Sequence, residues 1–134
     1  MVKLMATKLE KKVETAIQKW VNLLGISDYK FQVEYVDDKD LQGDYARIDT
    51  DEDTRIVGIT LNRYRLTREP KEVERTIVHE LLHTRLNELT EFMNNLIEQH
   101  LTNPKTRRML KRQVGKLEHK VIVPITEALI SQEK

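Results

Sequence analysis

The sequence predicts an α+β fold with an N-terminal helix, a three-stranded, mainly antiparallel sheet, a long helix and a returning C-terminal helix. Apolar residues recur with a helical period in both terminal parts of the chain, and three short segments between them alternate or are β-branched. The length of 134 residues is typical of one domain. We expect a single domain over 1–134, with the N-terminal helix in 1–25, the sheet in 30–61 and the helical part in 68–131.

The composition argues against a membrane-spanning protein and against a disulfide-stabilised one. Hydrophobic residues make up 39% of the chain and charged residues 34%, and no apolar run approaches the ~20 residues that span a bilayer. The N-terminus lacks the apolar centre of a signal peptide, so we expect a cytoplasmic protein with no membrane partner. The absence of cysteine excludes disulfides and thiolate metal sites. A net charge of +1 does not favour nucleic-acid binding.

The N-terminal helix is predicted from about residue 4 to residue 24. Val13, Ile17 and Trp20 fall on one stripe of this helix, and charged residues occupy the other side. Gly25 follows as a C-terminal stop. Such a stripe is typical of a helix that packs on its own domain.

Three strands are predicted after this helix. Residues 31–35 alternate between apolar and polar side chains, residues 43–49 form a second candidate strand, and residues 55–61 are the most apolar and richest in β-branched residues. The connections between them are short, which favours an antiparallel meander.

Two long helices complete the prediction. Thr67 can cap a helix that has Pro70 in its first turn and runs from about 68 to 101, because no Gly or Pro interrupts it after Pro70. Pro104 ends this helix, and the last helix is expected over 105–131.

The motif His-Glu-x-x-His occupies residues 79–83 of the long helix. Residues four apart lie on one face of a helix, so His79 and His83 can hold one metal ion between their rings. Glu80 is close enough to act as general base on a water at that metal. The motif lies on a helix with a buried face, because apolar residues around it follow the helical period: Ile77, Val78, Leu81, Leu82, Leu86 and Leu89. An ordinary helix with histidines at the rim of a core is the alternative.

A catalytic zinc ion usually takes three protein ligands, so a third donor is expected further along the chain. Glu118 lies among apolar residues of the last helix, where a carboxylate is costly unless something pairs with it. We expect Glu118 to be this ligand, with His119 and Glu127 as alternatives; a rim ion pair is the other interpretation of Glu118. His100 is excluded, because an unbroken helix would carry it about 25 Å beyond His83.

These features resemble the gluzincin metallopeptidases, in which a glutamate on a later helix follows the His-Glu-x-x-His motif. The resemblance is closest to the minimal members, the minigluzincins, and to small phage-type proteins of the same layout. It rests on the motif at 79–83, the strand at 56–61 before it and the segment 118–122 after it.

The resemblance implies that His79, His83 and Glu118 bind Zn²⁺, that Glu80 is the base and that the third strand is the edge along which a peptide extends. Larger gluzincins carry an Asp four residues after the ligand glutamate, where this chain has Ile122. They also have a Tyr or His that stabilises the oxyanion, and the sequence assigns no such residue.

The expected function is therefore a zinc-dependent metallopeptidase acting on a peptide or protein substrate. Zinc lowers the pKa of its bound water towards ~7, and Glu80 takes the proton and returns it to the leaving amine. One alternative is a catalytically silent zinc-binding interaction protein. The other is nucleic-acid association through the basic segment 105–116, although such a segment is more often a solvated helix face.

Overall fold

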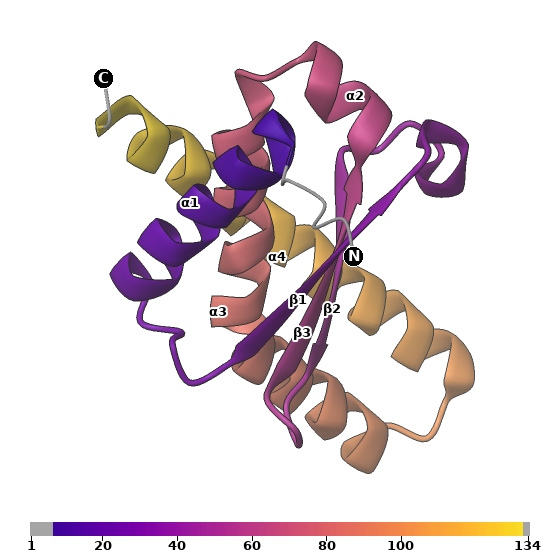
Figure 1. The fold of residues 1–134 in the computed structure, drawn as a ribbon. Helices are drawn as coiled ribbons and strands as arrows, with labels where there is room; N and C mark the ends of the chain where they lie inside the picture. Colours follow the sequence, from indigo (N-terminus) through magenta and orange to yellow (C-terminus); the bar gives the residue numbers. More distant parts are fainter. Residues whose placement is uncertain (1–6, 133–134) are drawn as a thin grey trace.

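The computed structural model describes residues 7–132, and it confirms the α+β class and the predicted layout from N-terminal helix to returning helix (Figure 1). The elements follow in the order α1 (Lys8–Leu23), β1 (Lys30–Val36), the 3₁₀ helix η1 (Asp38–Leu41), β2 (Ala46–Asp51), β3 (Ile56–Asn62), α2 (Arg63–Arg68), α3 (Glu72–His100) and α4 (Pro104–Gln132).

The sheet is mixed, with the strand order β1-β3-β2. The central strand β3 pairs parallel with β1 and antiparallel with β2. The predicted meander is therefore wrong, and so is the edge position expected for the third strand. The cause lies in residues 37–45, where η1 and its flanking turns carry the chain past the position of β3 before β2 begins. The edge strand beside the helical part is β2.

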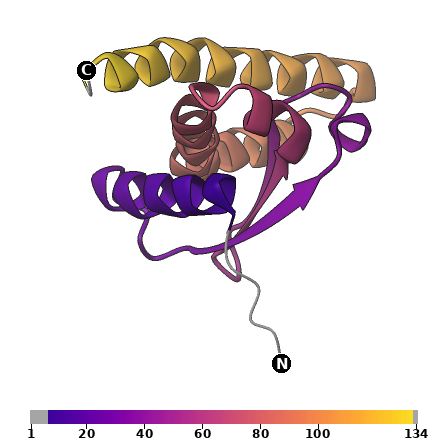
Figure 2. The same cartoon turned by 45° about the horizontal axis from the view of Figure 1, so that its top comes forward.

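One face of the sheet is apolar and covered by helices. Side chains alternate between the faces of a strand, so Val57, Ile59 and Leu61 of β3 point the same way, and all three are at most 1% exposed. They form one core with buried residues of α1 and α3. Figure 2 shows α1 and the sheet on one side of α3, and α4 on the other side.

The N-terminal helix begins close to its predicted position. Thr7 is its N-cap, and the Thr7 hydroxyl oxygen accepts a hydrogen bond from the backbone N–H of Glu10 at 3.1 Å. Residues 4–6, where the sequence predicted the start, lie outside the described residues. Gly25 follows the helix with a φ of 68°, a left-handed conformation that explains why this stop requires glycine.

The start of the motif helix differs from the prediction. Asn62 caps the separate helix α2, because its side-chain oxygen accepts from the Arg65 backbone N–H at 2.9 Å. Thr67 therefore lies inside α2 and does not cap α3. Lys71 takes the N-cap position of α3 without a side-chain hydrogen bond. The end of α3 and the start of α4 beside Pro104 agree with the prediction to within one residue.

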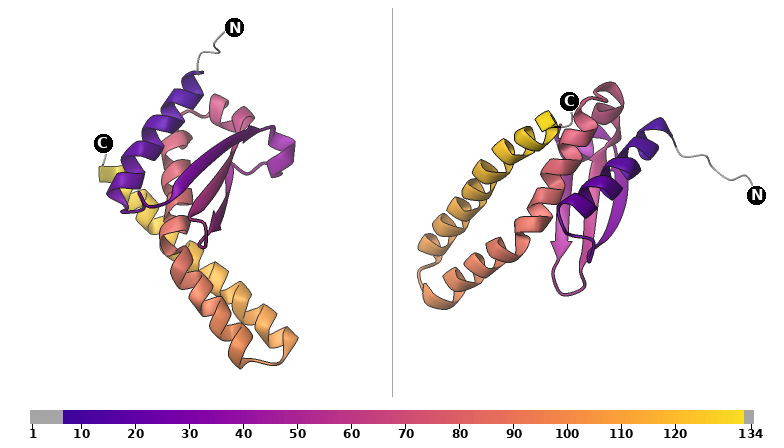
Figure 3. Two further views of the ribbon diagram at one scale, coloured as in Figure 1. Left: turned by 60° about the horizontal axis from the view of Figure 1, so that its bottom comes forward. Right: turned by 90° about the vertical axis from the view of Figure 1, so that its left-hand side faces the viewer.

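Helices α3 and α4 form a long antiparallel hairpin. The second half of α3 and the first half of α4 extend past the sheet and past α1 (Figure 3). The hairpin therefore has one end packed against the rest of the domain and one end that projects from it. In the described range, no helix is long and apolar enough to cross a membrane.

Candidate metal centre

Three histidine rings converge between α3 and α4. His79 and His83 lie one turn apart on α3, and their ring centroids are 5.1 Å apart. His119 of α4 brings a third ring, at 5.5 Å from His79 and 4.9 Å from His83. One nitrogen from each ring lies within 4.8 Å of the other two, so small ring rotations would bring all three onto one metal ion.

Glu118 lies beside this group and contacts one of its rings. Its carboxylate makes a hydrogen bond to Nδ1 of His83 and accepts a hydrogen bond from the Thr90 hydroxyl at 2.6 Å. With Nδ1 occupied, Nε2 is the nitrogen that His83 has left for a metal ion. Carboxylates in this position fix the orientation and tautomer of a metal-binding histidine.

The remaining candidates lie elsewhere. Glu127 forms a bidentate ion pair with Arg75, with one nitrogen–oxygen distance of 2.7 Å and another of 3.3 Å. His100 is the last residue of α3 and is exposed, as expected from its distance along the helix. Neither belongs to the group of three histidines.

Burial sets the protonation state of His79. Its pKa falls to about 4, mainly because burial disfavours the charged ring, and secondarily because positive charge on His83 or His119 would repel it. His79 is therefore neutral at pH 7. A histidine must be neutral to bind a metal ion, so His79 needs no costly deprotonation.

Burial acts in the opposite direction on Glu80. Its side chain is almost buried, and its pKa is raised to about 7, first by desolvation and then by the negative charge of Asp44. None of the described residues donates a hydrogen bond to its carboxylate. A carboxylate with a pKa near neutrality is suited to accept and return a proton.

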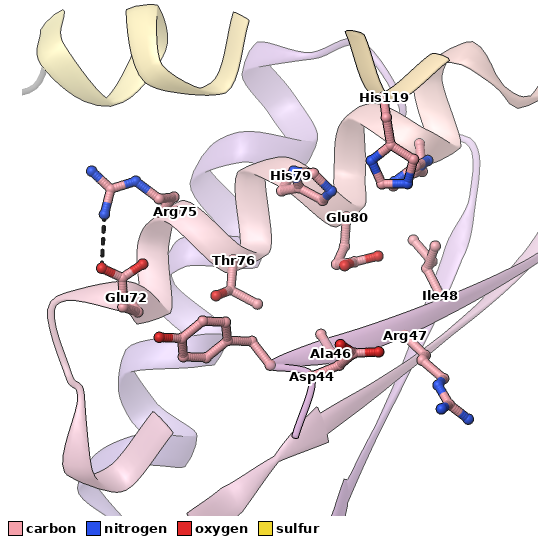
Figure 4. Close-up of a pocket in the computed structure, with 12 residues that line it drawn as sticks. Asp44, Ala46, Arg47, Ile48, Glu72, Arg75, Thr76, His79, Glu80 and His119 are labelled. Atoms are coloured by element: carbon pink, nitrogen blue, oxygen red, sulfur yellow. Dashed lines mark hydrogen bonds and ion pairs between the residues drawn. The ribbon is translucent and has the colours of Figure 1, made fainter. Parts of the chain in front are cut away.

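The histidines open into a cleft of about 620 Å³, bounded by α3, α4 and the edge strand β2. Figure 4 shows the Glu80 carboxylate between the histidine rings and β2, with Asp44 and Ala46 on the strand side. Tyr45 also lines the cleft, but its hydroxyl donates to Glu69 at 2.7 Å and accepts from Arg65 at 2.9 Å. The volume is within the usual range for ligand sites.

The sequence did not predict that β2 borders the cleft. Its alternating pattern was visible, with Arg47 and Asp49 exposed and Ala46 and Ile48 turned inward. No local sequence pattern, however, indicates the order of the strands in the sheet. His119 was visible as an alternative ligand, because it directly follows Glu118.

Comparison with known proteins gave no match among family models, curated proteins or solved structures. The membership in the gluzincins therefore stays a prediction, and the candidate site rests on its own residues and their geometry.

Proposed function

We propose that this protein is a zinc-dependent metallopeptidase in which His79, His83 and His119 hold the metal ion and Glu80 is the general base. The observation that carries the proposal is the convergence of three imidazoles from two helices beside a buried carboxylate in an open cleft. His119 thereby replaces Glu118 as the proposed third ligand. Glu118 is assigned to holding the His83 ring in place.

The donor set fits zinc. Three neutral imidazoles and one open position are a common arrangement of catalytic zinc sites, and nitrogen ligands suit zinc better than magnesium or calcium. When bound, the ion would supply a Lewis acid that polarises a peptide carbonyl and acidifies water.

The chain itself supplies the group that transfers the proton and the strand edge that can bind the substrate. Glu80, with a pKa of about 7, can take a proton from water and deliver it to the leaving amine. The outer edge of β2 carries backbone groups that β3 does not pair, so an extended peptide can add to it as a further strand. That strand would pass along the cleft in front of Glu80.

Exchange of Glu80 for Gln tests the proposal. Glu80→Gln removes the base but none of the proposed ligands, so we expect about one zinc per chain in both proteins and peptide cleavage by the wild type alone. Metal analysis and mass spectrometry of a digested peptide library measure the two properties. Equal cleavage by both proteins would contradict the assigned role of Glu80.

A catalytically silent zinc-binding interaction protein is the second candidate. It is favoured by Tyr45, whose hydroxyl is already engaged by Glu69 and Arg65 and so offers no free donor to an oxyanion. Bound zinc without cleavage of any library peptide would support this candidate. Nucleic-acid association is less favoured, because Glu98 already neutralises part of the basic segment through Arg107 and Lys111.

A further inference from the structure

The projecting hairpin carries a large exposed apolar surface, which we call the hairpin face. Its side chains are 37–59% exposed, although each is large and apolar. Isolated exposed apolar residues are ordinary, but a contiguous group of this size usually marks an interface. The hairpin face consists of Leu89, Phe92, Met93 and Leu96 on α3, and Leu117, Val121 and Ile125 on α4.

These residues form one surface and not two. On α4 they recur at intervals of four, and on α3 each lies three or four residues from another member, which places them on one side of each helix. A groove of about 350 Å³ joins the two stripes, and no charged side chain lines it. Its lining residues are Met93, Leu96, Ile97, Leu110, Gln113, Val114 and Leu117.

The hairpin face lies away from the histidine cleft. His119 is two residues from both Leu117 and Val121, and a separation of two residues corresponds to about 200° around a helix. The cleft and the hairpin face are therefore on different sides of α4. Because the hairpin extends past the sheet and α1, no other element in residues 7–132 covers this face (Figure 3).

The spacing of the apolar residues along α3 and α4 indicates what kind of partner would cover the hairpin face. Leucines recur every seven residues on α3, at 82, 89 and 96, with Leu86 and Met93 between them. On α4 the same spacing holds for Leu110, Leu117 and Pro124, with Val114 and Val121 between them. This is the pattern of helices in a four-helix bundle, in which each helix packs against two neighbours. In its packed half α3 also contacts α1, and Leu82 and Leu86 join that core. In the projecting half, α3 and α4 have only each other among residues 7–132 (Figure 3).

We propose that two copies of the chain pair through the hairpin face and form a symmetric four-helix bundle. A second hairpin has the same spacing and the same charge-free centre, so a two-fold arrangement meets no like-charge repulsion at its core. The seven apolar side chains, each 37–59% exposed, make a patch on the order of several hundred Å², the size that marks an interface. With a polar rim, such a patch approaches the ~800 Å² per partner of a stable interface. Both clefts stay open in such a dimer.

Two valines on α4 give a matched pair of variants. Val121 is 47% exposed and belongs to the hairpin face, whereas Val123 is 49% exposed and points to nearly the opposite side. We expect wild type and Val123→Glu to be dimers, and Val121→Glu to be a monomer, by light scattering and sedimentation over a range of micromolar concentrations. Leu96→Glu on α3 provides a second monomeric variant, and circular dichroism checks that each variant is folded.

Three outcomes would overturn the proposal: a wild type that is monomeric throughout, a dimer that Val121→Glu and Leu96→Glu leave intact, or equal loss of the dimer in both valine variants. A monomer that sediments with lipid vesicles only when Val121 is present would assign the face to a membrane surface instead. Because the hairpin face holds none of the proposed ligands, the dimer should persist in EDTA. The test is thus separate from that of zinc binding.

Discussion

Glu118 shows how a single carboxylate can serve a metal site without touching the metal. It bridges Nδ1 of His83 and the Thr90 hydroxyl, so both of its oxygens are engaged, and Nε2 of His83 is the nitrogen proposed for the ion. Such partners fix the ring orientation and strengthen the ligand. The side chains of Glu118 and His119 therefore have different proposed tasks although they are neighbours in sequence.

This division of tasks predicts different effects on metal affinity. Glu118→Gln should weaken zinc binding by about 10–100-fold, as expected for a partner of a ligand. His119→Ala should weaken it more, because it removes a direct donor. Competition with a chromophoric chelator at neutral pH measures both affinities. If His119→Ala retained zinc and Glu118→Gln lost it completely, Glu118 would be the ligand, as the sequence first suggested.

Glu80 makes the stability of the metal-free protein depend on pH. Its pKa is about 7 in the folded protein and near 4.5 when it is exposed, so the folded state favours the protonated carboxyl. The stability that this provides is fully present below about pH 4.5 and is lost as the pH rises through about 7. Metal-free Glu80→Gln should therefore exceed the wild type by up to about 3 kcal/mol near pH 8.

Urea unfolding in EDTA measures this difference, which should shrink to nearly nothing towards pH 4.5. His79 acts with the opposite sign, because its pKa is lowered to about 4 and its contribution is lost as the pH falls from about 6.5. Both proteins contain His79, so its effect cancels in the comparison. An equal difference at both pH values would show that Glu80 does not titrate near neutrality.

At the scale of elements, the sequence predicted what depends on local pattern. The 3.6-residue period around residues 79–83 and the break at Pro104 placed both long helices, and the β-branched run of 55–61 placed β3. The order of the strands depends on which side of β3 the chain crosses after Val36. The chain crosses in residues 37–45, which contain η1, but no local pattern in these residues indicates the crossing, and so the meander was predicted in its place.

The rotation of α4 about its own axis could not be predicted from the sequence either. Val114, Ile122 and Thr126 are the buried residues of this helix, and they set which side faces α3. Glu118 and His119 lie four and three residues before Ile122, so both are near the buried side, and sequence alone could not decide between them. Only the packed helices bring His119 to His79 and Glu118 to Nδ1 of His83.

The junction of β3 and α2 provides a prediction about an element. The fully buried Asn62 caps α2, and its side-chain nitrogen donates to Asp38 at 2.7 Å and to the carbonyl oxygen of Asp44 at 2.9 Å. Asn62→Ala should lower the free energy of unfolding by about 2–3 kcal/mol, because it removes a cap and leaves buried partners unsatisfied. Chemical denaturation measures the loss.

The exposed Gln32 on β1 offers the control for this variant. Gln32→Ala should change the free energy of unfolding by less than about 0.5 kcal/mol. Similar losses in the two variants would mean that the Asn62 contacts do not hold the junction between sheet and helix.

For the whole molecule, the hairpin of α3 and α4 separates two surfaces with different chemistry. One side carries the histidines, Glu80 and the cleft along β2, and the other carries the apolar hairpin face. His119 and Val121 are two residues apart on α4, yet one is assigned to metal binding and the other to pairing. A metal ion bound by His79 and His83 of α3 and by His119 of α4 would also hold α4 against α3. Binding of the proposed metal ion would therefore stabilise the fold.

Anomalous scattering at the zinc absorption edge, from crystals grown with zinc, tests the metal centre directly. We expect one strong peak bonded to ring nitrogens of His79, His83 and His119, with the Glu118 carboxylate at Nδ1 of His83. Rings that point away from each other with no peak between them would contradict the metal centre, and with it the proposed peptidase.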